Sequence, residues 1–130
     1  MSVNHKAQAL VIHCIDFRFQ EIIQADLEHR ELTGKFDRIS YPGASKNLGQ
    51  VKIASEVSLK LHDPDQVLIY EHEDCAAYGE NNSPEIHKEN AEKLKVLLKE
   101  LKPNLEVTFL IATFEGIREL VSRKLEIKDL

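Results

Sequence analysis

The feature that most constrains the fold is an alternation of short apolar runs with longer amphipathic segments. Apolar runs occur at residues 7–14, 35–41, 66–72 and 105–113. The first run is continuously apolar, which is typical of a parallel strand buried on both faces. Strands that alternate with helices form a parallel sheet with right-handed crossovers and helices on both faces. The sequence therefore predicts an α/β fold of three layers with a mostly parallel four- to five-stranded sheet. If the first and third strands are neighbours and the second lies outside the first, the strand order is 2-1-3-4.

The segments between these runs carry helix signals. Residues 19–32 place apolar side chains at helical spacing, and residues 45–62 do so over a broad face that we expect to be buried. The Ser-Pro pair at residues 83–84 predicts the start of a third helix, because serine caps helix N-termini and proline suits the first turn. In the tail, residues 114–130, the pattern allows either a short edge strand after Gly116 or a helix.

Length and charge restrict the kind of protein and partner. With 130 residues, the chain is predicted to form one domain over residues 1–130. The net charge of −5 and the scattered lysines and arginines argue against nucleic acid or an anionic membrane as a partner. The longest apolar run, before His13, is too short to cross a bilayer, and the N-terminus lacks the pattern of a signal peptide. We therefore expect a cytoplasmic protein whose main partner is neither nucleic acid nor a membrane.

Candidate metal ligands follow two of the predicted strands. Cys14 ends the first apolar run, His72 ends the third, and Cys75 lies three residues later. If these strands are neighbours, their carboxyl ends flank the point where the strand order reverses, which is where open α/β sheets bind ligands. Two thiolates and one imidazole with an open fourth position are typical of a catalytic zinc site. Unrelated core cysteines or a redox pair are the alternatives, and one zinc ion per chain is the favoured hypothesis.

An acid and a base follow the first candidate ligand. Asp16 and Arg18 are two residues apart, so on an extended chain both side chains point to the same side. A carboxylate beside a metal can accept a hydrogen bond from bound water or can ligate the metal itself. Arg18 would orient this carboxylate and keep it ionised. A surface ion pair at the start of a helix, where aspartate is favoured, is the alternative interpretation.

Several neighbouring side chains have two possible roles. Glu73 and Asp74 either orient the site residues or only solubilise a loop. His87 either shuttles protons or, as we favour, is a solvated histidine on a helix. An apolar wall would be needed to accept a nonpolar substrate. The candidates for this wall, each more simply explained as core, are Ile15, Phe17, Phe19 and Tyr41.

Two motifs together resemble the zinc-site signature of the β-class carbonic anhydrases. Residues 14–18, Cys-Ile-Asp-Phe-Arg, resemble the Cys-x-Asp-x-Arg segment of that family, and residues 72–75, His-Glu-Asp-Cys, resemble its His-x-x-Cys segment. The resemblance in element order extends over residues 9–113. Residues 40–43, Ser-Tyr-Pro-Gly, replace the usual Arg-Asn-Ala-Gly, and Ala76 replaces a glycine. The resemblance implies a β-carbonic-anhydrase-like fold, a zinc ion held by Cys14, His72 and Cys75, and a neighbouring dyad of Asp16 and Arg18.

The activity implied by this resemblance is the reversible hydration of carbon dioxide to bicarbonate by a zinc lyase, in which zinc makes hydroxide available from bound water. One alternative is hydrolysis of related linear substrates such as carbon disulfide and carbonyl sulfide. Another is a catalytically silent zinc-binding module, against which Asp16 and Arg18 argue. A thiol redox protein is disfavoured because the chain has no Cys-x-x-Cys motif. The resemblance and the open edge of a small sheet also predict a homodimer or a larger homo-oligomer.

Overall fold

The computed structural model describes residues 5–120, which form a five-stranded sheet in the order β2-β1-β3-β4-β5. The strands are β1 (Ala9–His13), β2 (Phe36–Ser40), β3 (Gln66–His72), β4 (Glu106–Thr113) and β5 (Gly116–Glu119). The first four strands pair in parallel, and β5 runs antiparallel to β4. The predicted class and the order of the first four strands are confirmed. Of the two alternatives for the tail, the edge strand is correct as far as residue 120, and residues 121–130 lie outside the described part.

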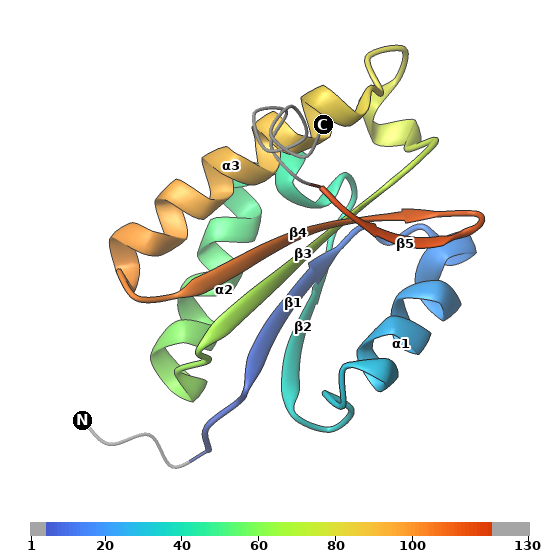
Figure 1. The fold of residues 1–130 in the computed structure, drawn as a ribbon. Helices are drawn as coiled ribbons and strands as arrows, with labels where there is room; N and C mark the ends of the chain where they lie inside the picture. Colours follow the sequence, from blue (N-terminus) through green and yellow to red (C-terminus); the bar gives the residue numbers. More distant parts are fainter. Residues whose placement is uncertain (1–4, 121–130) are drawn as a thin grey trace, which may run out of the picture.

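Helices cover both faces of this sheet (Figure 1). The α-helices are α1 (Gln20–His29), α2 (Leu48–His62) and α3 (Pro84–Leu101). One face carries α1, and the other carries α2 and α3, which pack side by side. The hydroxyl of Ser83 accepts a hydrogen bond from the backbone N–H of Ile86, so α3 begins at the predicted cap. None of the helices within residues 5–120 combines the length and the apolar character that a membrane span requires.

Three short 3-10 helices lie at the carboxyl edge of the sheet, one after each of the first three strands. They are η1 (Phe17–Phe19), η2 (Ala44–Lys46) and η3 (Ala76–Tyr78). Every residue of β1 is buried, as are all residues of β3 after Gln66. Because both central strands are covered on both faces, their positions are fixed by two hydrophobic cores rather than one. The sheet therefore holds the three turns in fixed positions along one edge.

The α2 helix buries less of its surface than we predicted. We expected a broad buried face over residues 45–62, but Ile53, Val57 and Leu61 are 61%, 54% and 57% exposed. These three residues are spaced four apart, so they form one apolar stripe that points away from the core. The fully buried side of the helix is narrow and includes two serines. The prediction was wrong because it assigned apolar residues from opposite sides of the helix to a single face.

Candidate metal centre

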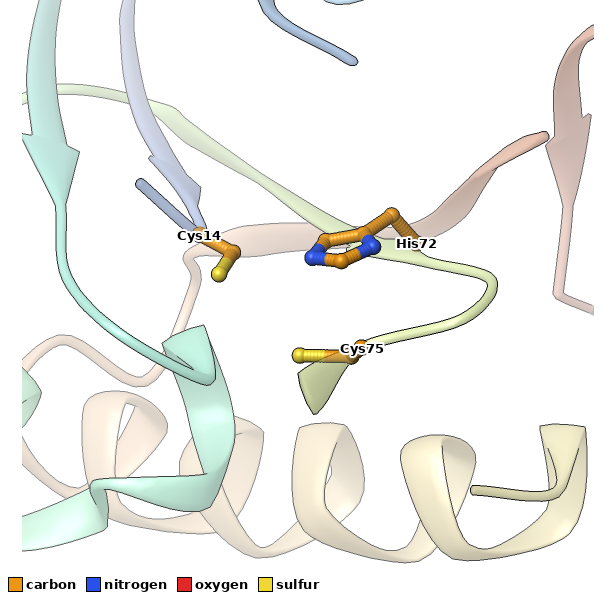
Figure 2. A group of neighbouring side chains, drawn as sticks. All are labelled: Cys14, His72 and Cys75. Atoms are coloured by element: carbon orange, nitrogen blue, oxygen red, sulfur yellow. The ribbon is translucent and has the colours of Figure 1, made fainter. Parts of the chain in front are cut away.

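The candidate centre lies where β1 and β3 end side by side (Figure 2). The two strands pair in parallel, with His13 opposite Tyr70. Cys14 directly follows β1, His72 is the last residue of β3, and Cys75 precedes η3. The three side chains are buried, and their candidate ligand atoms all lie within 4.8 Å of one another. The strand pairing thus brings together the three residues that the sequence analysis proposed as ligands.

The imidazole of His72 is oriented with its Nε2 atom available to a metal ion. Its Nδ1 atom lies 2.7 Å from the carbonyl oxygen of Glu73. Because a carbonyl oxygen only accepts hydrogen bonds, the proton is assigned to Nδ1 and the lone pair to Nε2. Phe19 stacks on the ring with a centroid separation of 4.6 Å. Within residues 5–120, His72 Nε2 is a buried atom without a hydrogen-bond partner, as expected of a metal ligand whose other nitrogen is already paired.

The sulfur atoms of Cys14 and Cys75 complete the donor set. Both cysteines are buried and neither forms a disulfide. A hydrogen bond from the Cys75 thiol lowers the pKa of Cys14, and the same interaction raises the pKa of Cys75. A cation bound by both sulfurs would favour the thiolate form of each. Two thiolates and one imidazole fit a zinc ion that keeps one coordination position open.

The segment between β2 and α2 closes one side of the centre. The backbone N–H of Gly43 donates to Sγ of Cys14 at 3.3 Å. Gly43 has a φ of 76°, and a Cβ atom there would lie only 3.2 Å from Cβ of Ala77. The ammonium group of Lys46 donates to the carbonyl oxygen of Ala77, which ties η2 to η3. Glycine is thus required at position 43 for its backbone conformation and for close packing, although the three preceding residues differ from the carbonic anhydrase pattern.

Asp16 and Arg18 form an ion pair beside the centre. Nη2 of Arg18 lies 2.7 Å from Oδ2 of Asp16, and its Nε lies 3.0 Å from Oδ1. These hydrogen bonds from Arg18 lower the pKa of Asp16 to about 2. Oδ2 of Asp16 is also 3.9 Å from Nε2 of His72. An ionised carboxylate therefore adjoins the nitrogen atom that would bind a metal.

A capping turn sets the geometry of this pair, rather than the extended chain that we expected. Asp16 accepts a hydrogen bond from the backbone N–H of Arg18 at 3.0 Å and so caps η1. Arg18 also donates to the carboxylate and to the carbonyl oxygen of Asp74, each at 3.0 Å. The guanidinium group therefore connects the segment after β1 with the turn between His72 and Cys75. Asp74 thus contacts the proposed dyad directly, whereas the Glu73 carboxylate accepts the backbone N–H of Phe114.

The four candidates for an apolar wall separate into two pairs. Phe19 is buried, and Tyr41 is partly buried against the core on the other face of the sheet. Ile15 and Phe17 are 52% and 84% exposed, and they flank Asp16 in the sequence. Only the second pair therefore offers apolar surface next to the proposed dyad.

The sequence analysis missed a buried polar cluster around Glu71. Glu71 precedes His72 on β3, is 2% exposed, and accepts hydrogen bonds from Ser45, Tyr78 and His87. Our interpretation of His87 as a solvated residue was wrong, because its side chain is buried and bonds to Glu71 through Nδ1 at 2.7 Å. An acidic residue inside an apolar strand was the available signal, since a buried carboxylate requires hydrogen-bond partners.

Solved structures that align with this chain include β-carbonic anhydrases. A carbonic anhydrase of Streptococcus mutans aligns with a TM-score of 0.62 and 14% identity, over 93% of this chain and 86% of that one. A β-carbonic anhydrase of Aspergillus fumigatus aligns with a TM-score of 0.61 and 16% identity, over 96% and 81% of the two chains. A tetrameric β-carbonic anhydrase of Sordaria macrospora aligns with a TM-score of 0.59 and 13% identity, over 92% and 83%. The protein therefore has the β-carbonic anhydrase fold.

The sequence itself defines the family. Residues 4–121 match the family described as "Putative carbonic anhydrase", and the chain belongs to this family. An uncharacterized protein of Rickettsia bellii is 26% identical over 136 residues, which cover 90% of this chain and 83% of that protein. An uncharacterized protein of Rickettsia conorii is 26% identical over 90% of this chain and 73% of its own length. The family that the two motifs predicted is thereby confirmed.

We predict that Cys75→Ser and His72→Asn each lose most of the bound zinc, whereas the wild-type protein holds about one zinc ion per chain. Each substitution removes one of three ligand atoms and leaves the metal with too few protein contacts. Elemental analysis of the purified, desalted proteins measures this loss. His29→Asn is the matched control, because His29 is exposed on α1, and it should retain the wild-type zinc content. Full zinc content in Cys75→Ser would refute the ligand assignment.

Proposed function

We propose that the protein catalyses the reversible hydration of carbon dioxide to bicarbonate and a proton, with one zinc ion held by Cys14, His72 and Cys75. The observation that carries this proposal is the buried, unpartnered Nε2 atom of His72, grouped with two cysteine sulfurs and 3.9 Å from the Asp16 carboxylate. Three protein ligands and an adjacent carboxylate suit a catalytic site, since structural zinc sites are usually closed by four protein ligands. The fold and the family support the same reaction.

A zinc ion bound by these side chains would lower the pKa of a coordinated water and so supply a nucleophile near neutral pH. Asp16 is suited to accept a hydrogen bond there, because Arg18 lowers its pKa to about 2 and the carboxylate stays ionised at neutral pH. Arg18 engages both carboxylate oxygens, which restrains Asp16 from turning toward the metal. We therefore assign Asp16 as a hydrogen-bond acceptor beside the metal rather than as a fourth ligand. Arg18 orients that acceptor.

The apolar surface next to this dyad suggests a role for a second copy of the chain. Ile15 and Phe17 expose 52% and 84% of their surface on either side of Asp16 in the sequence. We assign to these side chains the apolar contact that a nonpolar gas requires, and to a second copy the surface that covers them. Contiguous exposed apolar patches commonly mark protein–protein interfaces, and Ile15 and Phe17 would contribute to such a patch. The tetrameric structural neighbour of Sordaria macrospora supports self-association.

We predict that Asp16→Asn lowers the rate of carbon dioxide hydration by roughly 10²-fold or more while the zinc stays bound. The substitution keeps the size of the side chain and removes the charged acceptor. Because the pKa of Asp16 is about 2, the carboxylate is ionised throughout pH 7 to 9. The ratio of wild-type to variant rates should therefore be constant over this range, and Asp16 would lose its charge only in strong acid. Stopped-flow assays with a pH indicator measure both rates.

The matched control for this variant is Asp65→Asn. Asp65 also forms surface ion pairs, with Lys6 and Lys102, but it directly precedes β3 and so lies at the end of that strand far from the metal centre. The Asp65→Asn variant should hydrate carbon dioxide at the wild-type rate. Near-wild-type hydration in Asp16→Asn would show that the dyad is only a capping ion pair. The substrate assignment would be wrong if the zinc-loaded wild-type protein hydrolysed carbon disulfide but did not hydrate carbon dioxide.

We predict that the protein is at least a dimer at micromolar concentration, because self-association would cover the apolar side chains near the dyad. Light scattering coupled to size-exclusion chromatography should give a mass of two or more chains. The variant Phe17→Ser should shift the protein toward the monomer, whereas Val96→Ser, which removes an exposed apolar side chain from α3 and not from the segment beside the dyad, is the control. A wild-type mass near the 14.9 kDa of one chain would refute the prediction.

A further inference from the structure

Glu71 anchors a buried set of hydrogen bonds behind the candidate metal centre. Its carboxylate accepts from the hydroxyl of Ser45 at 3.0 Å, the hydroxyl of Tyr78 at 2.9 Å and Nδ1 of His87 at 2.7 Å. The three donors come from η2, η3 and α3. Among residues 5–120, the one basic side chain within ion-pair distance of Glu71 is His87. The carboxylate is therefore held by directional hydrogen bonds, which fix three separate elements against β3.

Asn82 extends this set from His87 to the turn that contains a candidate ligand. When the Asn82 amide nitrogen donates to Nε2 of His87 at 2.6 Å, the Asn82 side-chain oxygen accepts hydrogen bonds from two backbone N–H groups. These belong to Asp74 at 3.1 Å and to Cys75 at 2.8 Å. We assign this amide orientation because the opposite one would place the NH₂ group against two backbone donors. Nε2 of His87 is then an acceptor, so its proton lies on Nδ1 and points to Glu71.

The turn between His72 and Cys75 depends on contacts from outside. Asp74 has a φ of 52°, in the left-handed region, which aspartate tolerates better than most residues but still adopts uncommonly. Arg18 holds the carbonyl oxygen and the carboxylate of Asp74 from one side. The oxygen of Asn82 holds the two N–H groups from the other side. A residue in an unfavourable conformation persists only when its surroundings define its position in this way.

We propose that Glu71, His87 and Asn82 form a positioning relay that sets the Cys75 sulfur in the place a metal ion requires. Glu71 fixes the tautomer and orientation of His87, His87 orients the amide of Asn82, and the Asn82 oxygen fixes the backbone of Cys75. Loss of partners that orient a metal ligand typically weakens metal binding about 10- to 100-fold. The inference rests on the metal site of the proposed function and not on the reaction that occurs there.

Zinc affinity tests the relay through a pair of matched variants. Competition with a chromophoric chelator should show zinc binding about 10- to 100-fold weaker in Asn82→Ala than in the wild-type protein. Asn90→Ala is the control, because Asn90 donates to the hydroxyl of Tyr78 at 3.3 Å and so touches the same buried set without reaching the turn. It should bind zinc as the wild-type protein does. Asn82→Asp keeps an acceptor oxygen for Cys75 but offers Nε2 of His87 no donor, so it should recover only part of the lost affinity.

Two further measurements separate positioning from a general loss of stability. The visible spectrum of the cobalt-substituted protein reports the ligand geometry, and we expect it to change in Asn82→Ala and to stay unchanged in Asn90→Ala. In the metal-free protein, the backbone amide of Cys75 should exchange its hydrogen faster in Asn82→Ala, because it loses its acceptor.

The possible results distinguish a failure of the positioning relay from a failure of the proposed function. Wild-type zinc affinity and an unchanged cobalt spectrum in Asn82→Ala would overturn the relay, as would an equal loss of affinity in Asn90→Ala. If Asn82→Ala does not fold, rapid exchange of the Cys75 amide in Asn82→Asp would overturn it. Wild-type protein that binds zinc through Cys75 but does not hydrate carbon dioxide would refute the proposed function and leave the relay intact.

Discussion

The parallel pairing of β1 with β3 is the constraint on which the candidate centre depends. The two strands run in register from Ala9 opposite Gln66 to His13 opposite Tyr70. Both are buried on both faces, so a shift of one residue would move every side chain to the wrong core. Such a shift would also turn His72 away from Cys14. The hydrophobic pattern of two strands thus determines whether residues far apart in sequence meet at one site.

The centre itself combines groups that are costly to hold together without a cation. The sulfur atoms of Cys14 and Cys75 and the Nε2 atom of His72 lie within 4.8 Å of one another, and this Nε2 is buried without a hydrogen-bond partner. The turn before Cys75 contains a left-handed aspartate, Asp74. Hydrogen bonds from the Arg18 guanidinium and to the Asn82 side-chain oxygen hold this turn in place. A metal ion would satisfy the unpaired donor atoms, so we expect metal binding to stabilise the folded protein.

The strand order and the candidate ligands could be predicted from the sequence because they depend on features that sequence displays directly. Apolar runs mark buried strands, and side chains at the ends of parallel strands meet at one edge of the sheet. The buried surface of α2 was overestimated, since apolar residues on a helix do not reveal which of two sides faces the core. The position of Asp16 depends on a capping turn, and the burial of His87 depends on its contact with Glu71. These two features arise from side-chain contacts that periodicity does not encode.

X-ray absorption spectroscopy at the zinc K-edge tests most directly whether Cys14, His72 and Cys75 hold the metal. For the zinc-loaded protein we expect two sulfur atoms at about 2.3 Å, one imidazole nitrogen at about 2.0 to 2.1 Å, and one further light atom that completes a tetrahedron. Oxygen and nitrogen neighbours without sulfur would contradict the assignment. So would four sulfur neighbours, which would require cysteines from two chains and would leave no position for water.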